Sequence, residues 1–205
     1  MDEAVRIPAG AISLEGRLAP GRAGPGVIIT HPHPLFGGSL DNNVVWTAHR
    51  AFASRGWTTL RFNFRGVGQS TGAYDAGLGE TEDLAAAREF LAARVSGPVL
   101  VAGYSFGAYV AARALLAGLP VGGALLIAPP VAFMDLAFIP EVPLLELVVV
   151  GDRDALCPLA ALQALLARHP APPELAVLPG ADHFFGGREK ELFQVLQERA
   201  WPHSV

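Results

Sequence analysis

The sequence has little cysteine, no excess of positive charge and no long apolar run, and each of these absences excludes a class of protein. Cys157 is the only cysteine among 205 residues, so no disulfide can form within the chain, and a reducing, cytoplasmic setting is expected. Acidic residues number 19 against 15 Lys and Arg, which gives a formal net charge of −4. Because nucleic-acid binders present a basic patch or stripe, we expect no nucleic-acid partner.

No segment has the length and apolar character of a membrane span. The most apolar region, residues 123–140, is interrupted by Pro129, Pro130 and Asp135, which indicates a buried core segment. The first ten residues, MDEAVRIPAG, are acidic where a secretory signal would be basic. We therefore expect a protein that neither enters a membrane nor is exported.

Internal repeats and low-complexity tails are also missing from the sequence. Hydrophobic residues make up 51% of the chain, which is enough for one sizeable core, and chains usually divide only beyond roughly 250 residues. The Pro/Gly-rich stretch at residues 18–26 is too short for a domain linker. Residues 1–205 are therefore expected to form a single domain.

What the chain does contain is a regular alternation of apolar runs and helical patterns. The runs are nearly continuous and rich in β-branched residues, as expected of strands buried on both faces; they cover residues 26–30, 58–64, 98–104, 123–128, 144–150 and 174–178. Helices are predicted at residues 42–55, 81–95, 106–117, 158–168 and 187–199. This alternation predicts an α/β fold, a mostly parallel sheet with helices on both faces. Residues 3–18 are expected to add an antiparallel hairpin at one edge.

One short motif, GYSFG at residues 103–107, lies between a predicted strand and a predicted helix. In that context a Gly-x-Ser-x-Gly turn projects the serine hydroxyl above the sheet, and its glycines avoid collisions with neighbouring elements. The N–H of Phe106 then points towards an oxyanion, helped by the positive end of the helix. Ser105 is therefore a candidate nucleophile, although the motif read alone also suits a plain turn of small residues.

An aspartate loop and a histidine follow later strands of the predicted sheet. GDRDALCP, residues 151–158, comes directly after one strand, and PGADHFFGG, residues 179–187, comes after the next. In open α/β sheets, functional sites form beyond the carboxyl ends of the strands. Ser105, then an aspartate, then His183 is the chain order of a serine triad in such a fold.

Together with HPHPLFGGSLDNNVV and LRFNFRGVGQSTG, these stretches resemble the α/β-hydrolase superfamily over nearly the whole chain. The chain is similar to small bacterial members without a lid domain, related to carboxylesterases and dienelactone-hydrolase-like enzymes. The resemblance implies that Ser105 is the nucleophile, His183 the general base and Asp154 the orienting acid. Asp154 matches the family pattern Gly-x-x-Asp-x-x-apolar-Pro, whereas Asp152 is expected to hydrogen-bond loop amides. The implied reaction is hydrolysis of a small ester or thioester through an acyl-enzyme, without a cofactor.

The same resemblance places an oxyanion loop after the strand at residues 26–30. Where the superfamily often has His-Gly, this chain has His31-Pro32, and proline has no N–H to donate. The N–H of His33 is the preferred donor beside that of Phe106, and the N–H of Leu35 is the alternative.

Two other interpretations stay open. His31 and His33 lie two residues apart, so in an extended chain both side chains could bind one metal ion of a metallohydrolase. Against this, the serine turn at Ser105 would then have no purpose, and the sequence has no helix-borne His-Glu-x-x-His motif. The fold could also serve as a catalytically silent binding module, because a fold alone does not prove a function.

Access to the site can also be predicted. About 15 residues rich in Pro and Phe separate the strands at 123–128 and 144–150, which is too few for a lid domain. We therefore expect an open, shallow site, with Phe133 and Phe138 among the residues that line it.

Overall fold

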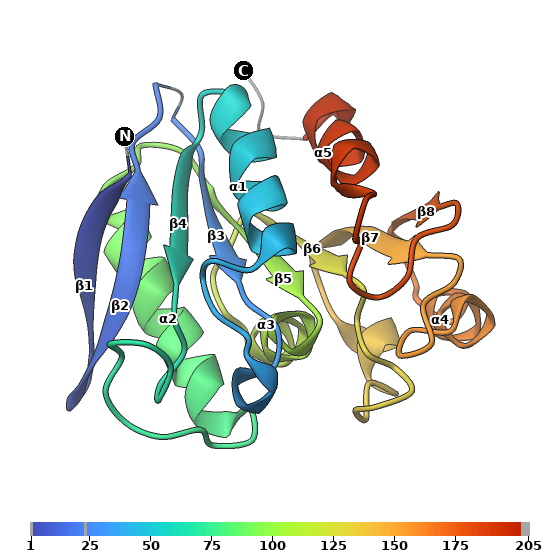
Figure 1. The fold of residues 1–205 in the computed structure, drawn as a ribbon, viewed down its shortest axis with the longest axis horizontal. Helices are drawn as coiled ribbons and strands as arrows, with labels where there is room; N and C mark the ends of the chain where they lie inside the picture. The colour runs from blue at the N-terminus through green and yellow to red at the C-terminus, as the bar shows by residue number, and fades with distance from the viewer. Residues whose placement is uncertain (1, 23, 202–205) are drawn as a thin grey trace.

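The computed structural model describes residues 2–22 and 24–201. They form an eight-stranded sheet in the order β1-β2-β4-β3-β5-β6-β7-β8, in which β3 to β8 run parallel (Figure 1). The strands are β1 (Glu3–Ala9), β2 (Ile12–Ala19), β3 (Gly26–Thr30), β4 (Thr58–Phe62), β5 (Val99–Tyr104), β6 (Gly123–Ile127), β7 (Leu145–Gly151) and β8 (Glu174–Leu178). The predicted parallel strands are all present.

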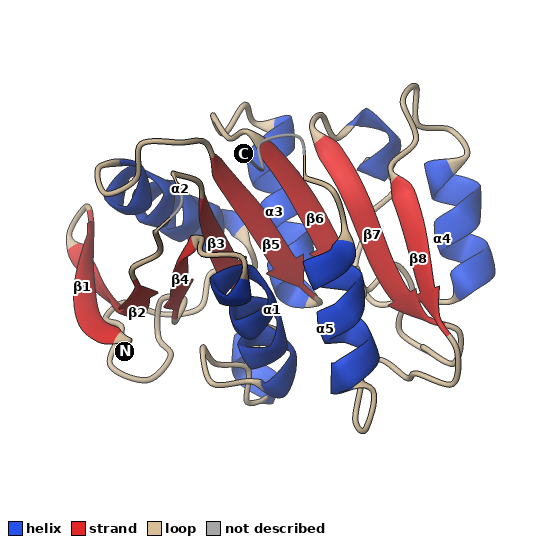
Figure 2. Ribbon diagram, turned by 90° about the horizontal axis from the view of Figure 1, so that it is seen from above, coloured by secondary structure: helices blue, strands red, loops and turns tan. Residues whose placement is uncertain are grey.

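Among the described residues, five α-helices cover the two faces of this sheet, and two short 3-10 helices lie in loops. Figure 2 shows α1 and α5 side by side on one face and α2, α3 and α4 on the other. The helices are α1 (Asn43–Ser54), α2 (Leu78–Ala92), α3 (Phe106–Leu116), α4 (Leu159–Leu166) and α5 (Glu189–Glu198), with η1 (Pro34–Phe36) and η2 (Ile139–Glu141).

The core has two layers because successive side chains of a strand point to opposite faces. In β3, Val27 and Ile29 pack in the layer beneath α1 and α5, and Ile28 packs in the layer beneath α2, α3 and α4. All five residues of β3 are buried, which explains its continuous apolar sequence.

The N-terminal segment forms the predicted edge hairpin. β1 pairs with β2, and β2 pairs with β4, both antiparallel. The turn between β1 and β2 uses Gly10 at φ +61°, a conformation that L side chains rarely adopt.

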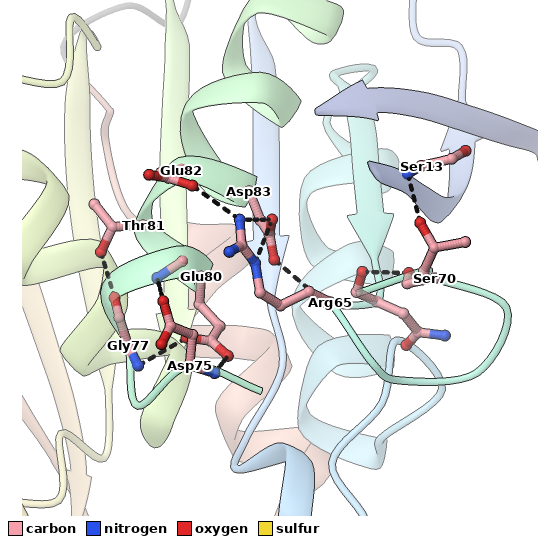
Figure 3. Close-up of polar contacts among 12 residues, drawn as sticks. Ser13, Arg65, Ser70, Asp75, Gly77, Glu80, Thr81, Glu82 and Asp83 are labelled. Carbon is pink, nitrogen blue, oxygen red and sulfur yellow. Dashed lines mark hydrogen bonds and ion pairs between the residues drawn. The ribbon is translucent and has the colours of Figure 1, made fainter. Parts of the chain in front are cut away.

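The segment between β4 and α2 departs from the predicted boundaries. β4 ends at Phe62, and the N–H of Phe64 donates to the side chain of His31 instead of a strand partner, at 3.0 Å. The helix begins at Leu78 rather than residue 81, because the Glu80 carboxylate accepts hydrogen bonds from the N–H groups of Gly77 and Asp75 (Figure 3).

A buried ion pair also holds this segment. Arg65 donates from Nη2 and Nε to Asp83 Oδ1 at 2.8 and 3.0 Å, and its backbone N–H donates to Oδ2 at 2.9 Å (Figure 3). The Asp83 side chain is fully buried, and this burial raises its pKa although the hydrogen bonds from Arg65 oppose the shift. The loop between β4 and α2 is thereby attached to the first turns of α2.

The connection from β6 to β7 spans residues 128–144 and contains only η2, so no lid domain lies there. Within residues 2–22 and 24–201, no helix is long and apolar enough to cross a membrane.

Candidate active site

Ser105 occupies a strained turn between β5 and α3. Its φ of 53° and ψ of −117° lie outside the regions that L residues favour, and its N–H is held by the carbonyl of Ile127 at 2.9 Å. A Cβ at Gly103 would lie 2.6 Å from the carbonyl oxygen of Gly107, and one at Gly107 would lie 2.8 Å from the carbonyl oxygen of His31. Both glycines are therefore required by close backbone approach.

Three side chains from separate strand ends form one hydrogen-bonded series. Ser105 Oγ lies 2.9 Å from His183 Nε2, and His183 Nδ1 lies 2.8 Å from Asp154 Oδ2. All three residues are buried, with exposed fractions of 8%, 4% and 4% for Ser105, Asp154 and His183. Such a series can pass the serine proton to the imidazole while the carboxylate fixes the imidazole orientation.

The two aspartates of the loop after β7 have different partners. Besides His183, Asp154 accepts hydrogen bonds through Oδ1 from the N–H groups of Leu156 and Cys157, both at 2.8 Å. Asp152 is exposed and accepts from the N–H of Gly180 at 2.6 Å. Asp154 is thus the aspartate that contacts the imidazole.

Cys157 lies beside this carboxylate but is no nucleophile. The side chain is fully buried, and burial together with the charge of Asp154 raises the pKa of the thiol to about 12. Because the thiolate is the reactive form, the thiol at Cys157 is inert at neutral pH.

Two residues that the sequence did not single out hold the His183 loop. Tyr104 donates from its hydroxyl to the carbonyl of His183 at 3.0 Å, and Asn43 donates from Nδ2 to the carbonyl of Phe184 at 3.0 Å. Burial raises the pKa of Tyr104, so its hydroxyl stays protonated and able to donate. The only sequence signals were positional: Tyr104 precedes the nucleophile, and Asn43 begins the helix after the HPHP loop.

His31 is fully buried and has a structural role in this geometry. Its Nε2 accepts from the N–H of Phe64 at 3.0 Å, and its Nδ1 lies 2.7 Å from the carbonyl of Pro32 and donates to it. Burial lowers its pKa to about 4, so the ring is neutral at pH 7. His31 therefore ties the loop after β3 to the loop after β4.

His33 instead borders the cavity next to Ser105. Its Nδ1 accepts from the N–H of Leu35 at 3.2 Å, and its Nε2 lies 3.2 Å from the hydroxyl of Tyr74. The Leu35 amide is therefore occupied, whereas no hydrogen bond of the His33 N–H is found within residues 2–22 and 24–201. This difference favours His33 over Leu35 as a donor to a bound oxyanion.

The metal interpretation loses its geometric basis. The ring nitrogens of His31 and His33 are all engaged with protein groups. Across the described parts of the chain, no group of three or more His, Cys, Asp or Glu side chains is arranged to hold a metal ion.

A cavity of about 300 Å³ opens next to Ser105 and His183. Its lining is dominated by aromatic and apolar side chains, which include Phe36, Phe106, Phe133, Met134 and Phe184. None of the described residues that line it is Lys, Arg, Asp or Glu. Phe133 lines the cavity as predicted, but Phe138 does not; its ring packs on Tyr109 instead, with centroids 6.3 Å apart.

The parallel sheet, the serine turn and the Ser–His contact at the strand ends are features of one fold class, and sequence comparison agrees. The α/β-hydrolase family matches residues 27–143, and a protein from Rickettsia prowazekii is 32% identical, with 90% of this chain and 83% of that protein aligned. The chain belongs to the α/β-hydrolase family.

Solved structures show which members of this family the chain is similar to. An α/β serine hydrolase homologue from Coxiella burnetii is 36% identical, covers 96% of both chains and superposes with a TM-score of 0.89. A serine hydrolase without a lid from Xanthomonas campestris is 34% identical, covers 96% of this chain and 92% of its own, and gives a TM-score of 0.87. The protein is therefore similar to serine hydrolases that lack a lid.

Proposed function

We propose that the protein hydrolyses carboxylic esters or thioesters through an acyl-enzyme formed on Ser105. The observation that carries the proposal is the buried series from Ser105 Oγ to His183 and Asp154, with contacts of 2.9 and 2.8 Å. A Ser–His–Asp series of this kind activates a hydroxyl that is otherwise a weak nucleophile.

In the first half-reaction His183 takes the Ser105 proton while Oγ attacks the acyl carbon. The protonated imidazole then gives that proton to the leaving oxygen or sulfur, and the acyl-enzyme remains. In the second half-reaction a water molecule, activated by His183, releases the acid and restores Ser105. Asp154 keeps the Nδ1 proton of His183 in place in both steps, so Nε2 faces the serine.

The negative charge of the tetrahedral intermediate needs donors that are already in position. The N–H of Phe106, at the start of α3, and the N–H of His33 are the donors we assign to it. Support for His33 comes from the Leu35 amide, which is already bound to the His33 side chain. The prolines on either side of His33 restrict this loop, which lowers the cost of ordering it during the reaction.

The cavity lining indicates an uncharged substrate with an apolar acyl group. Burying a charged group without a partner is costly, and the described residues that line this cavity include no Lys, Arg, Asp or Glu. Phe36, Phe133 and Phe184 are also exposed around it, so apolar groups of the substrate can be covered by their rings. No cofactor takes part in the proposed reaction.

The test combines active-site labelling with an activity panel. Wild type should react with a fluorophosphonate probe and hydrolyse p-nitrophenyl esters or acyl-thioesters of graded chain length. Ser105→Ala should abolish labelling and lower kcat by about a millionfold. Ser96→Ala, at an exposed serine, serves as the control and should match wild type. Labelling that survives in Ser105→Ala would remove Ser105 from the mechanism.

A further inference from the structure

The cavity presents few polar side chains to a substrate. Besides Ser105 and His183, its polar lining side chains are His33, Asn42 and Tyr104. Tyr104 donates its hydroxyl proton to the carbonyl of His183, and both ring nitrogens of His33 are engaged, with the Leu35 amide and the Tyr74 hydroxyl. Of these three side chains in the described part of the protein, Asn42 still has a polar group that can bind a substrate.

The orientation of the Asn42 amide follows from its position as the N-cap of α1. Its Oδ1 accepts from the N–H of Val44 at 2.9 Å, and only the oxygen of the amide can accept a hydrogen bond. The Nδ2 group is therefore the free end of the side chain. In the described parts of the chain no hydrogen bond of Asn42 Nδ2 is found.

Asn42 borders the cavity at the start of α1, next to the loop that carries His183. The next residue, Asn43, donates to the carbonyl of Phe184, so the start of α1 contacts the loop that carries His183. Phe184 lines the cavity together with Asn42. Because His183 must protonate the leaving oxygen, the alcohol part of an ester has to lie on the side of this loop.

We propose that Asn42 is a specificity-determining residue whose Nδ2 donates a hydrogen bond to an oxygen in the alcohol part of the substrate. The inference rests on the proposed esterase function and goes beyond it by naming the leaving group. The preferred alcohols are uncharged and carry an ether, hydroxyl or second ester oxygen close to the scissile bond. An alkyl alcohol leaves the Asn42 donor without a partner once water is displaced from it, which costs transition-state binding.

Two esters of equal size test this assignment: 2-methoxyethyl butanoate and butyl butanoate. They share the acyl group and hence the acyl-enzyme, so a difference in kcat/KM arises in binding and acylation. The intrinsic reactivity of the two alcohols cancels when the ratio of kcat/KM values in a variant is divided by that in wild type.

The matched variants are Asn42→Asp and Asn42→Ser. Asp is as good an N-cap as Asn and nearly isosteric with it, but its side chain has no N–H to donate. Ser also keeps the cap, and it adds no charge. We expect the preference for the methoxyethyl ester to fall about threefold to tenfold in both variants, as one hydrogen bond is lost. An unchanged preference in both variants, with hydrolysis intact, overturns this inference alone. Wild type that hydrolyses neither ester and is not labelled by the fluorophosphonate probe overturns the proposed function, and this inference with it.

Discussion

His183 Nδ1 lies 2.8 Å from Asp154 Oδ2. This contact distinguishes Asp154 from Asp152, which lies two residues earlier in the same loop and has a different partner. Asp154 is buried and its Oδ1 is also fixed by the N–H groups of Leu156 and Cys157. Asp152 points to the loop after β8, where it accepts from the N–H of Gly180. Two chemically identical side chains in one loop therefore have different environments and different expected roles.

Substitution of these aspartates distinguishes the roles. Asp154→Asn removes the charge that holds the imidazole and favours the wrong tautomer of His183, so we expect kcat to fall by about 10⁴. Asp152→Asn is the matched control and should cost mainly stability, about 1 kcal/mol. The measurements are kcat on one activated ester and urea unfolding of both variants. A large loss of kcat in Asp152→Asn alone would reverse the assignment.

The buried His31 should make the protein less stable in mild acid. Because its pKa is about 4 in the folded chain, against 6.5 for an ordinary exposed histidine, the unfolded chain binds more protons between these pH values. The contribution of neutral His31 to the free energy of unfolding is fully present above about pH 6.5 and is lost as the pH falls towards 4. From pH 7 to pH 5 the free energy of unfolding should drop by about 2 kcal/mol from this residue.

Urea unfolding at several pH values measures this dependence. His31→Asn is expected to lower stability at pH 7, because Phe64 loses its hydrogen-bond acceptor, and to flatten the slope of stability against pH. A smaller slope of stability against pH should remain in the variant, because burial also lowers the pKa values of His33 and His49. Equal slopes in wild type and His31→Asn would show that His31 is not the group that titrates.

Removing only one partner of the Arg65–Asp83 ion pair should lower the stability of the protein considerably. Arg65→Met leaves the Asp83 carboxylate buried without its cation, and we expect a loss of about 3 kcal/mol in the free energy of unfolding. Arg188→Met is the control, since the pair of Arg188 with Glu191 is partly exposed at 43% on each side, and its loss should be much smaller. Equal effects of the two substitutions would contradict the buried-pair argument.

Gly107 should tolerate no side chain. Ala is favoured over Gly in a helix, yet a Cβ here would lie 2.8 Å from the carbonyl oxygens of Thr30 and His31. We therefore expect Gly107→Ala to destabilise the protein by about 1–3 kcal/mol. Gly186→Ala, where a Cβ meets nothing within 4 Å, should change stability by less than about 0.5 kcal/mol. Thermal unfolding of the two variants decides between these outcomes.

Most of the fold could be predicted from the sequence because the central strands β3 to β6 are buried on both faces. Such strands are continuous apolar runs, and β3, which is buried throughout, begins and ends where its run does. The start of α2 was wrong by three residues, since Glu80 caps it through contacts with Asp75 and Gly77 that apolar periodicity does not reveal. The family and the absence of a lid domain also followed from motif order and loop length.

The sequence by itself determined that Ser105, an aspartate and His183 each follow the end of a strand, because motif position relative to a strand is a local property. Only the tertiary structure decided how each polar group near them is used. His31 is buried because Phe64, from another strand end, supplies its partner, while His33 borders the cavity. Hydrogen-bond partners distant in sequence are set by the packing of whole elements, and no local pattern specifies them.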